Sequence, residues 1–140
     1  MLAALALAAA GASAQDNEKN EHKVNPPAAA AAAFTKAYPG VAAKWEKEGG
    51  AYEASFKQNG NTMSAVYQAN GTLVETETAI KVADLPAAVL AWVKEHRKGE
   101  AIKEAAKIVK ANGEVNFEAE VKKMDLVFDA NGKFIKEEKD

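Results

Sequence analysis

Acidic side chains are the groups of this sequence that could most readily take part in chemistry. Glu53 stands in an alternating segment at 51–57, Glu118 and Glu120 stand in a second one at 114–122, and Glu75 and Glu77 follow the first. A carboxylate pair hydrolyses a glycosidic bond only where a cleft gives one member a raised pKa. The alternation implies no cleft, so it favours a charged sheet face over a catalytic pair.

The two histidines are also weak candidates for a catalytic or metal-binding role. His22 lies in a polar stretch without neighbouring ligands, which favours a solvated side chain. His96 stands near the end of a predicted helix, where a cation interacts favourably with the helix dipole. No Ser–His–acid arrangement is persuasive. We therefore predict that the chain is not an enzyme and that it has no catalytic residue.

Metal and cofactor motifs are equally weak. The chain contains no cysteine, which removes thiol nucleophiles and zinc–thiolate sites. Asp129 to Gly132 opens like a calcium loop, but the twelfth position is Asp140 rather than a bidentate Glu, and Gln68 replaces Asp129 in a similar segment. Gly49-Gly50 lacks the following helix of a phosphate loop. We predict a hairpin turn at 129–132, no metal and no cofactor.

The elements that must position these side chains are marked by Asn-Gly pairs, which favour type I′ turns between antiparallel strands. Residues such as Tyr52, Ala54 and Phe56 alternate with polar neighbours, as in a sheet with one apolar face. The pairs begin at Asn59, Asn70, Asn112 and Asn131, and the predicted strands are 42–48, 51–57, 62–69, 72–79, 101–110, 114–122, 124–129 and 133–137.

Two helices are predicted, each with Pro in its first turn and Gly at its end. The first runs from Pro27 towards Gly40, and the second runs from Pro86 towards Gly99, with Asp84 as a candidate N-cap. Apolar side chains at spacings of three and four predict the faces that pack on the sheet. These side chains are Ala30, Phe34 and Tyr38 in the first helix, and Val89, Leu90 and Val93 in the second; Trp45 is expected in the core and Trp92 at a helix flank.

The same order of signals occurs twice. The segment PAAAAAAFTKAYPG matches PAAVLAWVKEHRKG, and YQANGTLVE matches FDANGKFIK. Such a period is typical of duplicated supersecondary units. We predict an α+β fold of two tandem αββββ repeats at 27–80 and 84–138, which form one domain over 27–140. About eight antiparallel strands would carry two helices on one face.

Residues 1–14 have the features of a signal peptide. An apolar block precedes Ala12-Ser13-Ala14, which suits signal peptidase, and no cysteine follows that could carry a lipid. Residues 15–26 are polar and are expected to form a flexible arm. We predict a periplasmic or secreted protein that is not inserted in a membrane after cleavage.

Composition narrows the range of partners. The chain has 140 residues, 48% of them hydrophobic, and a formal net charge of -2. These values fit one globular domain. They provide no basic stripe for a nucleic acid, so no nucleic-acid partner is predicted.

The order of LPAAV, YPG, KWEKEGG, YEASF and the QANG and DANG turns resembles the PepSY-like family, described as β-lactamase-inhibitor-like. The resemblance covers residues 27–137 and implies an exported binding or inhibitory module. We therefore expect a non-catalytic protein-binding module, an inhibitor of an envelope or secreted enzyme, with a partner-binding polar sheet face. Its residues would be Glu53, Ser55, Lys57, Ser64, Val66, Gln68, Asn116, Glu118 and Glu120. The alternative is a periplasmic carrier or sensor of a small ligand or peptide.

Overall fold

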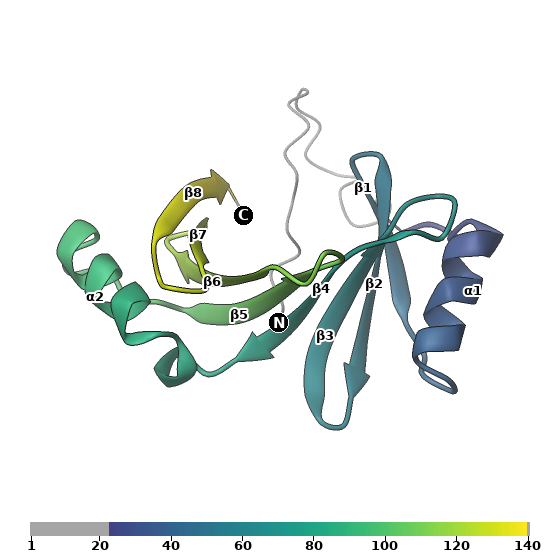
Figure 1. Cartoon of the computed structure of the whole chain (residues 1–140), viewed down its shortest axis with the longest axis horizontal. Helices are drawn as coiled ribbons and strands as arrows, with labels where there is room; N and C mark the ends of the chain where they lie inside the picture. Colours follow the sequence, from purple (N-terminus) through teal and green to yellow (C-terminus); the bar gives the residue numbers. More distant parts are fainter. Residues whose placement is uncertain (1–22, 140) are drawn as a thin grey trace. The chain divides into compact units, whose positions relative to one another are not determined.

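The computed structural model describes residues 23–139 and contains two helices, a short 3-10 helix and eight strands (Figure 1). The strands are antiparallel where their registers are resolved, and they follow one another in chain order from β1 to β8. Thr76 ends an N-terminal unit and Glu77 begins a C-terminal unit, within β4. The elements are α1 (Ala28–Ala37), β1 (Lys44–Glu48), β2 (Ala51–Gln58), β3 (Asn61–Tyr67), β4 (Leu73–Ile80), η1 (Val82–Asp84), α2 (Ala87–His96), β5 (Glu104–Lys110), β6 (Val115–Val121), β7 (Met124–Asp129) and β8 (Phe134–Lys139).

In the N-terminal unit, α1 packs on the apolar face of the first strands. Phe34 is buried, and its ring centre lies 5.0 Å from that of Phe56 and 5.8 Å from that of Trp45. Ala30, also fully buried, lets the helix approach closely. The predicted helix face is confirmed, and Trp45 is a partly buried member of this core.

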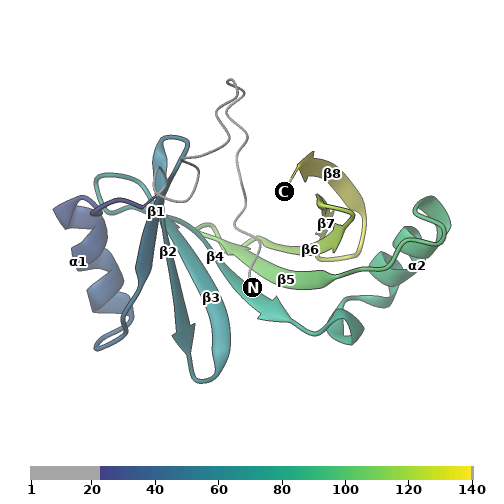
Figure 2. The same cartoon turned by 180° about the vertical axis from the view of Figure 1, so that it is seen from behind.

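In the C-terminal unit, α2 covers the equivalent face of β5 to β8 (Figure 2). Val89 and Val93 of the helix belong to the same core as Leu126 and Phe128. Trp92 stacks on Phe134 with a centroid distance of 4.4 Å. The predicted α+β class and the two helices on an antiparallel sheet are therefore confirmed.

The start of α2 differs from the prediction. Asp84 closes the 3-10 helix η1, and Pro86 occupies the N-cap position of α2 without a side-chain cap hydrogen bond. Proline cannot donate a backbone hydrogen bond and has a fixed φ, so it suits this boundary without Asp84. The predicted role of Asp84 as the N-cap is wrong.

Turn types also differ. Both Asn59 and Gly60 have positive φ, as a type I′ turn requires, but at the other three Asn-Gly pairs only the glycine does. Those turns are closed by a glycine N–H donating three residues back, as Gly132 does to Asp129. A turn with two positive φ values instead joins β6 to β7 at Lys122 and Lys123, where no glycine marked it.

Part of the predicted arm is ordered against the sheet. Lys23 forms a bridge with Glu46 of β1, and the backbone N–H of Val24 donates to the carbonyl of Trp45 at 3.2 Å. Residues 23 and 24 thus pair with the edge of β1, which can accept a further strand, and the flexibility of residues 15–26 stays a prediction. The predicted signal peptide at 1–14 lies outside the described residues.

Each helix rests directly on a glycine turn of its own unit. A methyl group on Gly71 would lie 2.7 Å from the carbonyl oxygen of Ala29, and one on Gly132 would lie 2.5 Å from the Cβ of Ala88. Real side chains do not approach this closely, so glycine is required here for space as well as for its positive φ. The turn thus sets how closely helix and sheet pack.

Two alanine substitutions separate the requirement for a positive φ from the requirement for space beside the helix. Gly113 has a φ of 87° with open space around it, whereas Gly132 has a φ of 83° and contacts α2. We expect Gly113→Ala to lower the free energy of unfolding by about 1 kcal/mol through backbone strain alone. Gly132→Ala should cost about 3 kcal/mol, because it also displaces the helix. Urea denaturation measures both, and equal losses would contradict the close helix contact.

Candidate functional site

The polar face of the C-terminal unit carries a row of carboxylates in one cross-strand register. Glu104 of β5 lies opposite Glu120 of β6, Glu120 lies opposite Asp125 of β7, and Asp125 lies opposite Glu138 of β8. Directly opposed residues of antiparallel strands point to the same face. The next row, which contains Ala105, belongs to the apolar core beneath α2. The acidic row therefore lies on the face away from that core.

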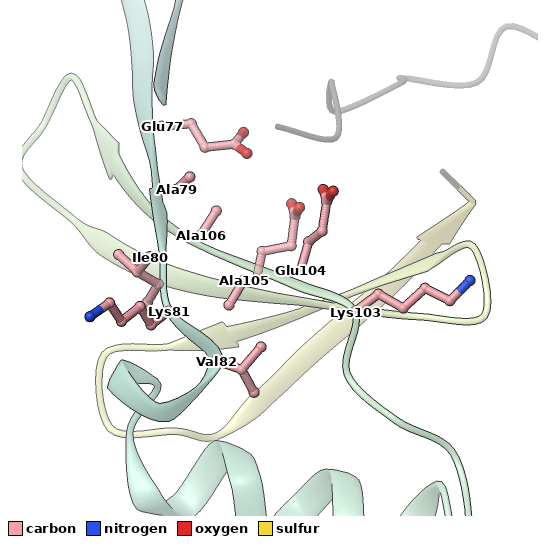
Figure 3. A pocket seen from close by; sticks show the side chains of 10 residues that line it. Glu77, Ala79, Ile80, Lys81, Val82, Lys103, Glu104, Ala105 and Ala106 are labelled. Atoms are coloured by element: carbon pink, nitrogen blue, oxygen red, sulfur yellow. The ribbon is translucent and has the colours of Figure 1, made fainter. Parts of the chain in front are cut away.

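Next to this row lies a pocket of about 410 Å³, lined by the end of β4 and the following turn, by β5 and by Glu118 of β6. In Figure 3 the carboxylates of Glu77 and Glu104 project into the same open space, while the ammonium groups of Lys81 and Lys103 point in opposite directions. Two lining acids are deeply buried, with Glu77 3% exposed and Glu118 2% exposed. The pocket is therefore an acidic environment with lysines on its wall.

Like charges held this closely are costly. Opposed carboxylates repel one another across strands, and burial removes the water that would screen them. Lys136 binds Glu138 within β8, which supplies one compensating charge.

A second group of acids lies on the polar face of the N-terminal unit. Glu53, 3% exposed, lies opposite Glu46 and accepts a hydrogen bond from the Ser55 hydroxyl at 3.3 Å. Burial is the main cause that raises the pKa of Glu53 above its ordinary 4.5. The charges of Glu46 and Glu75 raise this pKa further, while hydrogen bonds with Glu48 and Ser55 partly oppose the shift.

The nine predicted partner-binding residues fall into three groups. Five are buried, namely Glu53, Ser64, Val66, Asn116 and Glu118; Ser55 and Glu120 are half-buried; Lys57 and Gln68 are exposed. The expectation of an open, solvated face is therefore wrong for the first five. Alternation assigns side chains to a face, but it does not measure how closely their neighbours cover them. Partner binding by these residues stays a prediction.

The carboxylate row was missed from the sequence. Glu104 and Asp125 stand in predicted strands and Glu138 directly follows the last one, but the three come together only through the register of three successive hairpins. The tight turn at Lys122 and Lys123 fixes Glu120 opposite Asp125. Counting outwards from that turn would have revealed this pair, but the turn contains neither Gly nor Asn.

Other motifs have structural roles. The Asp129 carboxylate accepts hydrogen bonds from the backbone N–H groups of Asn131 and Lys133, each at 2.9 Å, so residues 129–132 form the predicted hairpin turn. His96 ends α2, stacks on Trp92 and lies with its Nδ1 2.9 Å from the Trp92 carbonyl. Within residues 23–139, no group of three acidic or histidine side chains could hold a metal ion. The same residues contain no helix that is long and apolar enough to cross a membrane.

No protein-family model and no curated protein matches the sequence. Among solved structures, the chain is similar to a BLIP-like protein from Bacteroides fragilis NCTC 9343, with 27% identity over 89% of this chain and 92% of that one and a TM-score of 0.62. A DUF2874 family protein from Bacteroides ovatus ATCC 8483 has 21% identity, coverage of 83% and 89%, and a TM-score of 0.70.

A third solved structure, described as a periplasmic protein from Bacteroides eggerthii DSM 20697, has 18% identity, coverage of 83% and 90%, and a TM-score of 0.72. These similarities establish a β-lactamase-inhibitor-like fold of the α+β class. The PepSY name and the internal duplication stay predictions.

The raised pKa of Glu53 makes stability depend on pH. An acid with a raised folded-state pKa stabilises the fold below its ordinary pKa, and this contribution is lost as pH rises through the folded value. We therefore expect Glu53→Gln to raise the melting temperature at pH 7, because glutamine carries no buried charge. The gain should disappear below the ordinary value of 4.5. Thermal melts by circular dichroism across this range measure the difference.

Glu95→Gln, on the exposed surface of α2, is the matched control and should leave the pH profile unchanged. A Glu53→Gln variant that is less stable than the parent at pH 7 would show that the hydrogen bonds of the carboxylate outweigh its burial.

Proposed function

We propose that the chain is an exported, non-catalytic protein-binding module that engages its partner through the polar sheet face of the C-terminal unit. The observation that carries the proposal is the register that aligns Glu104, Glu120, Asp125 and Glu138 across four adjacent strands. Four carboxyl groups in one row make this face complementary to a partner surface of opposite charge.

The chemistry of this face selects a partner segment with Lys or Arg side chains. Glu120 and Glu104 are half-buried and can make direct contacts, whereas Asp125 and Glu118 are buried beside them. Basic side chains would form charge-assisted hydrogen bonds with the accessible carboxylates. Binding should therefore weaken with added salt.

An inhibitory role would follow if the partner is an envelope or secreted enzyme. The BLIP-like name of one similar structure supports this role, and the periplasmic description of another supports export. The apolar block at the start of the sequence supports export independently. Inhibition is then steric: a rigid sheet face covers the entrance to the partner's site, and no bond is made or broken.

Carriage of a small cationic ligand or peptide is the second candidate. It is favoured by the pocket of about 410 Å³ at Glu77, Glu104 and Glu118, because this volume falls in the range of about 300 to 1,000 Å³ found for ligand sites. Spermidine is a suitable small probe, since it matches the acidic lining and has no protein surface of its own.

Neutralising the accessible carboxylates tests the main proposal. We expect Glu104→Gln/Glu120→Gln to weaken binding of a hexalysine peptide about tenfold, because two charge contacts are lost. Isothermal titration calorimetry measures this affinity, and cross-linked capture from the envelope extract of the native organism checks that one stoichiometric protein depends on the same residues. The matched control is Asp84→Asn/Glu95→Gln, which removes two exposed charges outside this face.

Equal affinity and equal capture by both double variants would overturn the choice of surface. Capture of no protein, together with spermidine binding that is lost in Glu77→Gln, would replace the protein-binding proposal with the carrier. If a partner enzyme is captured, its turnover should fall on addition of the chain and recover with the Glu104→Gln/Glu120→Gln variant.

A further inference from the structure

Strand β8 forms one edge of the sheet. It pairs with β7, and among the described residues no strand pairs with its outer side. The opposite edge, β1, is partly covered by Lys23 and Val24. An edge strand presents a row of backbone N–H and C=O groups that can pair with another strand.

Strand β8 also carries a run of exposed side chains. Ile135 is 47% exposed, the more exposed of the two large hydrophobic side chains that are classed as exposed in the described part of the chain. Lys136 and Glu137 beside it are also exposed. The accessible side chains of this edge strand are therefore one apolar group flanked by charged ones, and the charged ones can determine which strand pairs with it.

The charge order along β8 specifies the kind of strand that would pair with it. Residues opposed across an antiparallel pair share a face, so a partner needs an acid opposite Lys136 and a base opposite Glu138. Read from its own N-terminus, that partner strand carries a base, any residue and then an acid. Lys136, Glu137 and Glu138 have this order themselves. The edge is therefore complementary to a second copy of the same strand.

Two β8 strands related by a two-fold axis at Glu137 have this complementary order of charges. Lys136 then lies opposite Glu138 of the second copy, and Glu138 lies opposite Lys136 of the second copy. Ile135 falls opposite Lys139 of the second copy, whose aliphatic stem can cover it. The contacts of Lys136 and Glu138 use the regular part of the strand, whereas Ile135 lies at the irregularity between the pairs Val127–Lys136 and Phe128–Phe134.

The axis would bring two Glu137 carboxylates together, which alone would be unfavourable. The guanidinium of Arg97 already binds the Glu137 carboxylate in each chain. Two Arg97 side chains would therefore accompany the two acids, and the group on the axis would carry no net charge. The arrangement meets the requirement that opposed like charges be compensated.

We propose that β8 is a self-association edge, and that two copies of this chain pair through antiparallel β8 strands centred on Glu137. Five residues of strand from each chain bury less than the roughly 1,200 Å² of a stable interface, so the dimer is weak and reversible. This inference does not rest on the partner proposed for the acidic face, although Glu138 belongs to both surfaces.

Charge reversal tests the pairing directly. Lys136→Glu alone places two acids opposite each other, and Glu138→Lys alone places two bases opposite each other. We expect each single variant to weaken self-association about tenfold, since two attractive pairs become repulsive. The double variant Lys136→Glu/Glu138→Lys restores complementarity and should associate like the parent chain. Sedimentation velocity of the full chain, up to about 1 mM, measures the dissociation constants.

Mixing the two single variants provides the strictest control. Each repels its own copies, but a Lys136→Glu chain is complementary to a Glu138→Lys chain, so the mixture should form a heterodimer. Lys94→Glu, an exposed reversal on α2, should leave association unchanged. Melting curves confirm that each variant is folded. A parent chain that stays monomeric at the highest concentration, or folded single variants that do not associate when mixed, would overturn the proposal.

Discussion

Antiparallel pairing with a two-residue period underlies both faces of each unit. Once a hairpin turn fixes one opposed pair, every other pair along the two strands follows, and each residue is assigned to a face. The same register that buries Ala105, Ala119 and Leu126 beneath α2 therefore aligns Glu104, Glu120 and Asp125 on the other side. A shift of one strand would therefore disrupt the apolar core and the acidic row together.

The acidic row concentrates carboxyl groups on one face of the C-terminal unit. The carboxyl groups of Glu77, Glu118 and Asp125 are buried, and loss of hydration makes their charged forms costly. In the same unit, the tight contact between Gly132 and α2 belongs to a closely packed apolar layer that can offset this cost. We infer that packing on one face permits charge concentration on the other.

The two proposed interaction surfaces differ in physical nature. The face of the C-terminal unit presents an excess of one charge and suits a partner of opposite charge. The edge at β8 presents Lys136 and Glu138 on one face, pairs on its outer side with no strand among residues 23–139, and suits a strand of matching charge order. Because Glu138 belongs to both surfaces, self-association and partner binding are expected to influence each other.

Local signals in the sequence determined much of the fold. Pro27 and Pro86 preceded the helices, apolar spacing selected Phe34 and Val93, and alternation identified the strands, because these depend only on neighbouring residues. Tertiary structure alone decided which acids meet, how deeply Glu53 and Glu118 are buried, and that Pro86 rather than Asp84 begins α2. Cross-strand opposition and desolvation arise between residues distant in sequence, so local pattern could assign a carboxylate to a face but could not give its neighbours or its exposure.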